Sequence, residues 1–231
     1  MRAPVTPRAA RLGDWVSEVV HTGAEGALRG GIDQLVRRNL RGVWVTGEIP
    51  AGACVWAANH HSWWDFFVAA AALRATGRRD VGVLMDAGNV GRPGLFQQVG
   101  VVGTDQLRTA VQMLRDGMAL VVFPEGELRP FGAVGQVHRG ARWLADRSGA
   151  QLRAVGTRVV MRGQQAPEAY LQVSGALGPD VDLARALGDS VVGLDALLAG
   201  ADPAEPLPGF RPVVTGVRSW NERFGALRGG R

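Results

Sequence analysis

The first forty residues of the chain carry a helical pattern of apolar positions. Between Leu12 and Leu40, apolar side chains recur at intervals of three and four residues, and charged side chains occupy the other positions. The pair Gly30-Gly31 interrupts this pattern, so we expect an N-terminal arm over residues 1–41 that holds one amphipathic helix or a helix pair. Such a helix packs on its own domain or lies along a membrane surface, and the pattern leaves both open.

From residue 42 onward, short apolar runs alternate with helical patterns. A strand, a helix and another strand in this order indicate a right-handed crossover in a largely parallel sheet. The predicted strands are Gly42–Gly47, Ala53–Ala58, Val81–Met85, Ala119–Phe123, Leu152–Met161 and Ala169–Val173. The predicted helices are Trp63–Thr76, Gln106–Arg115 capped by Asp105, a segment after Arg139 that ends near Ser148, and a last stretch capped by Asp180 that reaches Leu198.

The fold class that follows is α/β, with a mostly parallel central sheet flanked by helices and an N-terminal amphipathic helical arm. We expect a single domain over residues 42–231 after the arm. Within it, Gly88–Gly103 should form a glycine-rich loop with a short helix near Leu95–Gln98, and the Pro-rich segment after Ala201 should be extended.

The stretch Asn59–Asp65 lies where a predicted strand passes into a predicted helix. Ser62 is a favourable N-cap and Asp65 stands three positions later, as in a capping box, so the helix should begin near Trp63. Because side chains on a helix lean toward its N-terminus, the Asp65 carboxylate should reach His60. The helix dipole favours an ionised carboxylate there, which would hold the imidazole with one nitrogen protonated and the other free as a base. The stretch therefore predicts a His–Asp dyad.

A second group of polar residues follows the strand Ala119–Phe123, which runs directly into Pro124-Glu125-Gly126. Ligand sites in parallel sheets lie at the C-terminal ends of the strands. If this strand neighbours the one that delivers His60, then the base, its carboxylate and Glu125 surround one cleft. That arrangement suits general-base catalysis on a hydroxyl group.

These motifs resemble those of a known family. Asn-His-x-Ser-x-x-Asp at Asn59–Asp65, followed by Phe-Pro-Glu-Gly at Phe123–Gly126, is similar to the glycerolipid acyltransferases typified by lysophosphatidic acid acyltransferases. The resemblance covers roughly residues 43–160. It implies an acyltransferase domain in which Asp65 orients His60, and His60 deprotonates a lipid hydroxyl that attacks the thioester of an acyl-CoA or acyl-ACP donor without an acyl-enzyme.

The resemblance also suggests which residues bind substrates. Glu125 and Gly126 match the motif that positions acceptor and donor in the family. The other residues that we expect to contact substrate are Pro124, Arg129, Asn59, Ser62, Trp63 and Trp64. The two tryptophans belong either to the core or to an acyl-chain channel.

The sequence departs from the family where the acceptor phosphate is bound. The family continues Glu-Gly with Thr-Arg-Ser, whereas this chain has Glu127-Leu128-Arg129, with Leu128 at the position of the Arg. A second family Arg falls at about Gln106, with Arg108 two residues further, and the family's Val-Pro motif reads Val155-Gly156. Acyl transfer is therefore better supported than lysophosphatidate as acceptor, and a neutral lipid or glycolipid hydroxyl is an alternative.

Composition excludes several kinds of chemistry. All 26 basic side chains are Arg, so no Schiff-base lysine or P-loop lysine is present. The single cysteine, Cys54, excludes an internal disulfide and a cysteine-based zinc site. His60, His61, Asp65 and Glu125 lack the spacing of a known zinc motif. We therefore expect no metal and no cofactor, with acyl-CoA or acyl-ACP as a donor substrate.

The net charge of +5 and the pI of about 10.9 suit an anionic partner. No aromatic–basic strand motif points to nucleic acid, and seven Trp favour an interface with lipid. We see neither a signal-peptide pattern nor an uncharged apolar run of about 18 residues. The expected protein is cytoplasmic and peripheral on the inner face of the membrane, where it meets a lipid acceptor, an acyl thioester and, for one kind of donor, acyl carrier protein. A hydrolase that uses the same dyad, and a lipid-binding protein without catalysis, are the alternatives.

Overall fold

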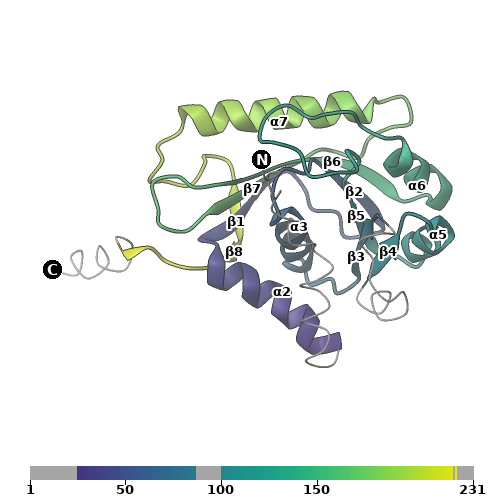
Figure 1. The fold of residues 1–231 in the computed structure, drawn as a ribbon, viewed down its shortest axis with the longest axis horizontal. Coiled ribbons are helices and arrows are strands. Elements are labelled where there is room, and N and C mark those ends of the chain that lie inside the picture. The colour runs from purple at the N-terminus through teal and green to yellow at the C-terminus, as the bar shows by residue number, and fades with distance from the viewer. Residues whose placement is uncertain (1–24, 87–99, 221, 223–231) are drawn as a thin grey trace, which may run out of the picture.

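The computed structural model describes residues 25–86, 100–220 and 222, with the backbone alone for residues 25–30. Within these ranges, eight strands form one sheet in the order β4-β3-β5-β2-β6-β7-β1-β8 (Figure 1). The strands are β1 Gly42–Thr46, β2 Cys54–Ala58, β3 Val81–Met85, β4 Val101–Gly103, β5 Ala119–Val122, β6 Gln151–Val160, β7 Glu168–Val173 and β8 Arg211–Thr215. The helices are α2 Glu25–Asn39, α3 Asp65–Arg74, α5 Leu107–Arg115, α6 Gly140–Ser148 and α7 Leu183–Gly200.

Neighbouring strands run parallel except in the β6–β7 and β1–β8 pairs, which are antiparallel. The predicted α/β fold with a mostly parallel sheet is confirmed. β2 lies at the centre between β5 and β6, and both of these strands run parallel to it. β2, which leads into Asn59-His60, and β5, which leads into Phe123-Pro124, are therefore neighbours, with their carboxyl ends at the same edge of the sheet.

The core lies on both faces of the sheet. Alternate residues of a strand face opposite sides, so Trp56 packs with Phe67 of α3 on one face, whereas Val55 packs with Leu144 of α6 on the other. In Figure 1, α2 and α3 lie on one side of the sheet and α7 on the other. Each large apolar side chain buried in this way stabilises the fold by about 1.5–3 kcal/mol. The central strands thus gain rigidity from both layers.

In the described part of the arm, α2 is one helix that continues through the glycine pair, where one helix and a helix pair were both open. The helix spans Glu25–Asn39 without a break at Gly30-Gly31. Val36 and the following Leu40 are fully buried in the cluster that includes α3, and this packing offsets the cost of about 1 kcal/mol per glycine in a helix. The remainder of the predicted arm, residues 1–24, lies outside the described residues. Across the described ranges, none of the helices is long and apolar enough to cross a membrane.

Several element boundaries differ from those predicted. β4 is a three-residue strand at the edge of the sheet, inside the segment expected to be a loop. α5 begins at Leu107 with Gln106 as its N-cap residue, and no side chain caps it. α7 is capped by Asp182, whose carboxylate accepts from Ala184 N–H at 2.8 Å, instead of by Asp180.

The Pro-rich segment after α7 is extended in part, as predicted, but it also contributes to the sheet. Arg211–Thr215 forms β8, which pairs antiparallel with β1. The short helix expected at Leu95–Gln98 lies outside the described residues.

Gly156, which stands where the family has Pro, is in close contact with α7. Its N–H donates to Ser190 Oγ of α7 at 3.1 Å. A Cβ on residue 156 would lie 2.5 Å from that oxygen, so only glycine lets α7 approach β6 this closely.

Candidate active site

The end of β2 delivers the first polar residue of the site. Asn59 is 3% exposed, and its side-chain amide pairs with the backbone of Thr157 on β6. Oδ1 accepts from the Thr157 N–H at 2.7 Å, and Nδ2 donates to the Thr157 carbonyl at 3.2 Å. The regular ladder between β2 and β6 ends at Ala58, so the amide continues the pairing where the backbone of β2 leaves the sheet. Asn59 thereby directs the chain toward His60, and its contact with substrate stays a prediction.

His60 and Asp65 lie within hydrogen-bond distance, as the local spacing predicts. His60 Nδ1 is 3.0 Å from Asp65 Oδ2. The same oxygen accepts from the backbone N–H groups of His61 and Ser62, each at 2.8 Å. Three N–H groups thus converge on one carboxylate oxygen at the N-terminus of α3, where the helix dipole also favours negative charge. With Nδ1 donating to this carboxylate, His60 Nε2 carries the free lone pair of a base.

The turn before α3 contains the predicted reciprocal contacts, but the helix starts later than expected. Ser62 Oγ accepts from Trp64 N–H at 3.2 Å, and the Asp65 carboxylate reaches back to Ser62 N–H. The expected start at Trp63 is nevertheless wrong, because α3 begins at Asp65. Asp65 N–H bonds to the Ser62 carbonyl three residues earlier, at 3.1 Å, so residues 62–64 form a tight turn of the 3₁₀ kind.

The ring of His60 is oriented by an aromatic neighbour as well as by the carboxylate. It stacks on Phe123, which follows β5, with ring centroids 4.2 Å apart and an angle of 19° between the planes. The imidazole side chain is 23% exposed, whereas the Asp65 carboxylate is buried. The imidazole is therefore packed on one face by Phe123 and bound at one edge by Asp65, while part of the ring stays accessible.

Glu125 connects the loop after β2, which carries His60, with the loop after β5, to which Glu125 itself belongs. It is 6% exposed, and its Oε2 accepts from His60 N–H at 2.9 Å while its Oε1 accepts from Gly135 N–H at 2.8 Å. In return, the N–H of Arg129 donates to the His60 carbonyl at 2.7 Å. Both backbone polar groups of His60 are thus bound to the loop that follows β5.

Pro124 and Gly126 set the path of the same loop. The Pro124 carbonyl accepts from His138 N–H at 2.8 Å, just before α6. Gly126 has a φ of +75°, a left-handed conformation that costs a residue with a side chain roughly 1–2 kcal/mol. The glycine of the Phe-Pro-Glu-Gly motif is therefore required by the backbone, whatever it contacts in a complex.

The remaining predicted substrate-binding residues border this centre. Trp63 and Trp64 are partly buried and pack against the cluster of α3, with the Trp63 ring 4.5 Å from that of Phe67. This supports a core contribution and leaves one part of each indole accessible. Arg129 is 43% exposed through its side chain, and its guanidinium pairs with Glu127.

His61 and Arg158 also bind the backbone and side chains around His60 and Asp65. Neither was predicted to be a site residue from the sequence. His61 Nδ1 lies 3.2 Å from Asn59 Nδ2, and its Nε2 lies 3.4 Å from the N–H of Val159. Burial lowers the pKa of His61, partly opposed by the charge of Asp65. The neutral ring can accept from one of these donors, whereas a second ring proton would find only Asp65 Oδ1, 3.9 Å from Nδ1 and beyond hydrogen-bond distance, which agrees with the lowered pKa.

Arg158 holds the loop after Glu125 against the sheet. Its side chain is 1% exposed and makes two bonds to Asp195 of α7, at 2.6 and 2.7 Å. It also donates to the Gly132 carbonyl at 2.7 Å and lies 4.4 Å from the ring centroid of Phe131. A charged residue inside an apolar strand pattern was the available signal for this contact.

Among the residues that the structure describes, no three His, Cys, Asp or Glu side chains gather in an arrangement that could hold a metal ion. The site is built from an imidazole, two buried carboxylates and backbone amides. An imidazole bound to a carboxylate in this way has the composition of a general base.

Comparison with known proteins agrees with this picture. A family model described as Acyltransferase matches residues 42–158, just over half of the chain, including both polar loops. Among solved structures, the 1-acyl-sn-glycerophosphate (LPA) acyltransferase PlsC from Thermotoga maritima is similar in fold, with a TM-score of 0.55 and 17% sequence identity over 82% of this chain and 90% of that chain. None of the curated proteins matches the sequence. The range of the family match confirms the resemblance expected over residues 43–160, and the chain belongs to the Acyltransferase family as an acyltransferase.

Proposed function

We propose that the chain moves a fatty acyl group from an acyl-CoA or acyl-ACP thioester to a hydroxyl of a lipid acceptor, with His60 as general base and Asp65 as its orienting carboxylate. The contact of 3.0 Å between His60 Nδ1 and Asp65 Oδ2 carries this proposal. It favours the tautomer that leaves Nε2 free, and the family membership supports the acyl-transfer chemistry.

In the proposed reaction, His60 Nε2 takes the proton of the acceptor hydroxyl while the oxygen attacks the thioester carbonyl carbon. The new C–O bond forms and the C–S bond breaks, so the thiolate leaves and recovers the proton from His60. The Asp65 carboxylate stabilises the imidazolium between these two proton transfers. No covalent acyl-enzyme is required.

Glu125 contributes to this reaction by holding the backbone of His60 in place. Its two carboxylate oxygens bind the N–H groups of His60 and Gly135, which leaves their remaining lone pairs for substrate contacts. Loss of the carboxylate would release the loop that carries the base.

The loop surface favours an acceptor without a phosphate at this point. Leu128, at the position of the family's Arg, is 57% exposed, and Phe131 is 61% exposed. The guanidinium of Arg129, the residue after Leu128, pairs with Glu127. That of Arg158, 4.4 Å from the Phe131 ring centroid, is bound to Asp195. Exposed apolar side chains on the loop that binds the backbone of His60 suit a neutral lipid or glycolipid hydroxyl better than lysophosphatidate. They also suit a peripheral position on the cytoplasmic face of a membrane.

The test is a thiol-release assay with purified protein, acyl-CoA and acyl-ACP donors, and a panel of acceptors that includes lysophosphatidate, monoacylglycerol and a glycolipid. We expect acylated product with the wild-type protein and its loss in His60→Ala, while the surface variant Arg185→Ala retains activity. Efficient acylation of lysophosphatidate alone would contradict the neutral acceptor.

Two other outcomes would replace the proposal. Free fatty acid released at the same rate without any acceptor would indicate the hydrolase alternative. Undiminished turnover in His60→Ala would place the catalytic centre elsewhere, and absence of turnover with every pair would favour the lipid-binding protein.

A further inference from the structure

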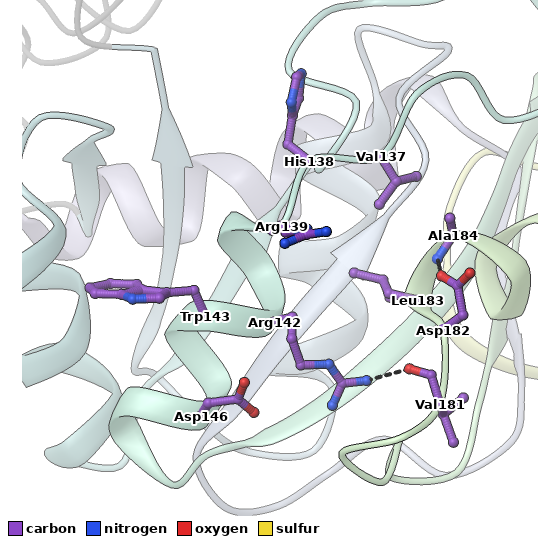
Figure 2. A pocket seen from close by; sticks show the side chains of 10 residues that line it. All are labelled: Val137, His138, Arg139, Arg142, Trp143, Asp146, Val181, Asp182, Leu183 and Ala184. Carbon is purple, nitrogen blue, oxygen red and sulfur yellow. Dashed lines mark hydrogen bonds between the residues drawn. The ribbon is translucent and has the colours of Figure 1, made fainter.

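A surface cleft of about 460 Å³ runs along α6 beside the first turn of α7. His138 and Arg139 lie at the end where α6 begins, and Asp146 lies toward the other end of the helix (Figure 2). Trp143 and Leu183 lie on opposite sides of the arginines in this view. Neither His60 nor Asp65 lines the cleft, so it is separate from the dyad.

The end of the cleft at His138 adjoins the catalytic loops. His138 N–H donates to the Pro124 carbonyl at 2.8 Å, and its ring lies 3.4 Å from the place where a Cβ on Gly126 would be. Glu125, which lies between Pro124 and Gly126 in the sequence, binds the backbone of His60. A ligand in the cleft therefore has one end beside the loop that positions the base.

This end of the cleft is positively charged. The Arg139 guanidinium makes no hydrogen bond or ion pair with any residue that the structure describes, and the first turn of α6 has no acidic residue. Asp146 stands seven residues further along the helix, about 10 Å away at 1.5 Å per residue. Asp182, also in the cleft, accepts from the Ala184 N–H that it caps. The unpaired cation and the positive end of the helix dipole favour a phosphate here.

The cleft also offers an aromatic surface. Trp143 is 40% exposed, although most tryptophans of this chain's described part lie in or against the core. The Arg142 guanidinium donates to the Val181 carbonyl at 2.7 Å and so holds the loop before α7 against α6 (Figure 2). A cleft of this volume with a cation at one end and an indole beside it fits a ligand that has both phosphates and a planar ring.

We propose that this cleft binds the phosphorylated adenine nucleotide of an acyl-CoA donor, with the phosphates at Arg139 and His138 and the adenine against Trp143. The proposal rests on the proposed function in that it takes a thioester as the donor. It selects coenzyme A over acyl carrier protein, because the carrier protein presents the same thiol arm without a nucleotide. An acceptor headgroup with one phosphate has no planar ring to stack on Trp143, whose indole otherwise meets only the Arg147 guanidinium, 5.9 Å from the ring centroid, among the ring contacts of the described residues.

Equilibrium binding of coenzyme A, measured by isothermal titration calorimetry, tests the proposal without catalysis. We expect Arg139→Ala and Trp143→Ala each to weaken coenzyme A binding about tenfold or more, since each loses one charge-assisted or stacking contact. Pantetheine, which lacks the nucleotide, should bind equally to wild-type protein and to both variants. Arg185→Ala removes the same charge from a neighbouring exposed position of α7 and should leave the affinity unchanged.

The result that overturns the proposal is an Arg139→Ala/Trp143→Ala double variant that binds coenzyme A as the wild type does. A drop in affinity for lysophosphatidate or for acyl-ACP, with coenzyme A unaffected, would likewise overturn it and assign the cleft to the acceptor phosphate or to the carrier protein.

His60→Ala separates the two proposals. It should bind coenzyme A with wild-type affinity. If no acceptor is acylated by wild-type protein and yet coenzyme A binding depends on Arg139, the catalytic proposal fails and the cleft stands. If acyl transfer proceeds and the KM for acyl-CoA is the same in both cleft variants, the cleft proposal fails and the catalytic one stands.

Discussion

Replacing Asp65 by Asn removes one negative charge beside His60 and preserves the shape of the side chain. In the wild-type protein, Oδ2 receives N–H groups from His60 Nδ1, from His61 and from Ser62. An Asn oxygen can accept the same three bonds, but it cannot neutralise an imidazolium. The substitution therefore separates the charge of Asp65 from its geometry.

The expected loss of rate follows from the distance. With Nδ1 and Oδ2 3.0 Å apart, the centres of charge are separated by about 4 Å, which at an effective dielectric constant of about 20 corresponds to about 4 kcal/mol. That energy is present only while His60 is protonated, so kcat should fall roughly a thousandfold. The three hydrogen bonds each weaken by about 1 kcal/mol when the acceptor becomes neutral, which lowers the free energy of unfolding by about 3 kcal/mol.

The measurement is kcat from thiol release at saturating donor and acceptor, with the folded fraction established by urea unfolding. Asp189→Asn, at a 76% exposed side chain of α7, loses the same charge and should change neither quantity. In a His60→Ala background, Asp65→Asn should cause no further loss of rate, because the two residues act as a unit. A kcat within tenfold of the wild type in folded Asp65→Asn protein would refute the assigned role.

Three other substitutions or treatments give expected outcomes. Glu125→Gln should lower both kcat and the free energy of unfolding, the latter by about 1–3 kcal/mol, because an amide nitrogen must then face a backbone N–H. For His61, the lowered pKa means that its contribution to stability is complete above the ordinary pKa and is lost as the pH falls through the lowered one; His61→Gln should therefore flatten the decline of Tm between about pH 7 and pH 5. Burial raises the pKa of Cys54 to about 11, so a disulfide reagent at about pH 8 should label no thiol in folded protein and one in unfolded protein.

Each of these outcomes has a control. Glu127→Gln changes an exposed carboxylate two residues from Glu125 and should be neutral; equal effects of the two would contradict the buried contacts. The exposed His138 provides the comparison for His61, and a parallel effect of His138→Gln on the pH dependence would assign that dependence elsewhere. Rapid labelling of Cys54 in the folded state would show that β2 opens readily. The thiol-release assay would then also count the thiol of Cys54.

The part of the site that sequence predicts best is the part made by local spacing. Asp65 lies three residues after Ser62 at the start of a helix, and that geometry brings its carboxylate to His60 without help from the rest of the fold. The adjacency of β2 and β5 was only a condition of the predicted cleft, because the sequence shows two short apolar strands that end in polar residues but not which strands pair, and the structure supplies that pairing. A pattern within a few residues is sufficient for the pair His60 and Asp65 alone.

Contacts between segments that are far apart in the sequence could not be predicted. The Oε1 partner of Glu125 is the amide of Gly135, which no side-chain pattern identifies. β4 is three residues long, too short for an alternating pattern, and β8 lies in a Pro-rich segment whose pairing depends on β1 being an available edge. Asp180 and Asp182 are both suitable caps, and the burial of Leu183, the first residue of α7, in the core cluster distinguishes them.

The binding of His60 through its backbone has a consequence for the evolution of the site. Glu125 and the Arg129 amide hold the N–H and the carbonyl of residue 60, and neither contact depends on which side chain stands there. The loop thus holds the backbone of residue 60 in the same place whichever side chain the residue carries. A chain that loses the imidazole keeps a preformed space bounded by Phe123 and Asp65, so free imidazole from solution is a natural candidate for restoring the missing base.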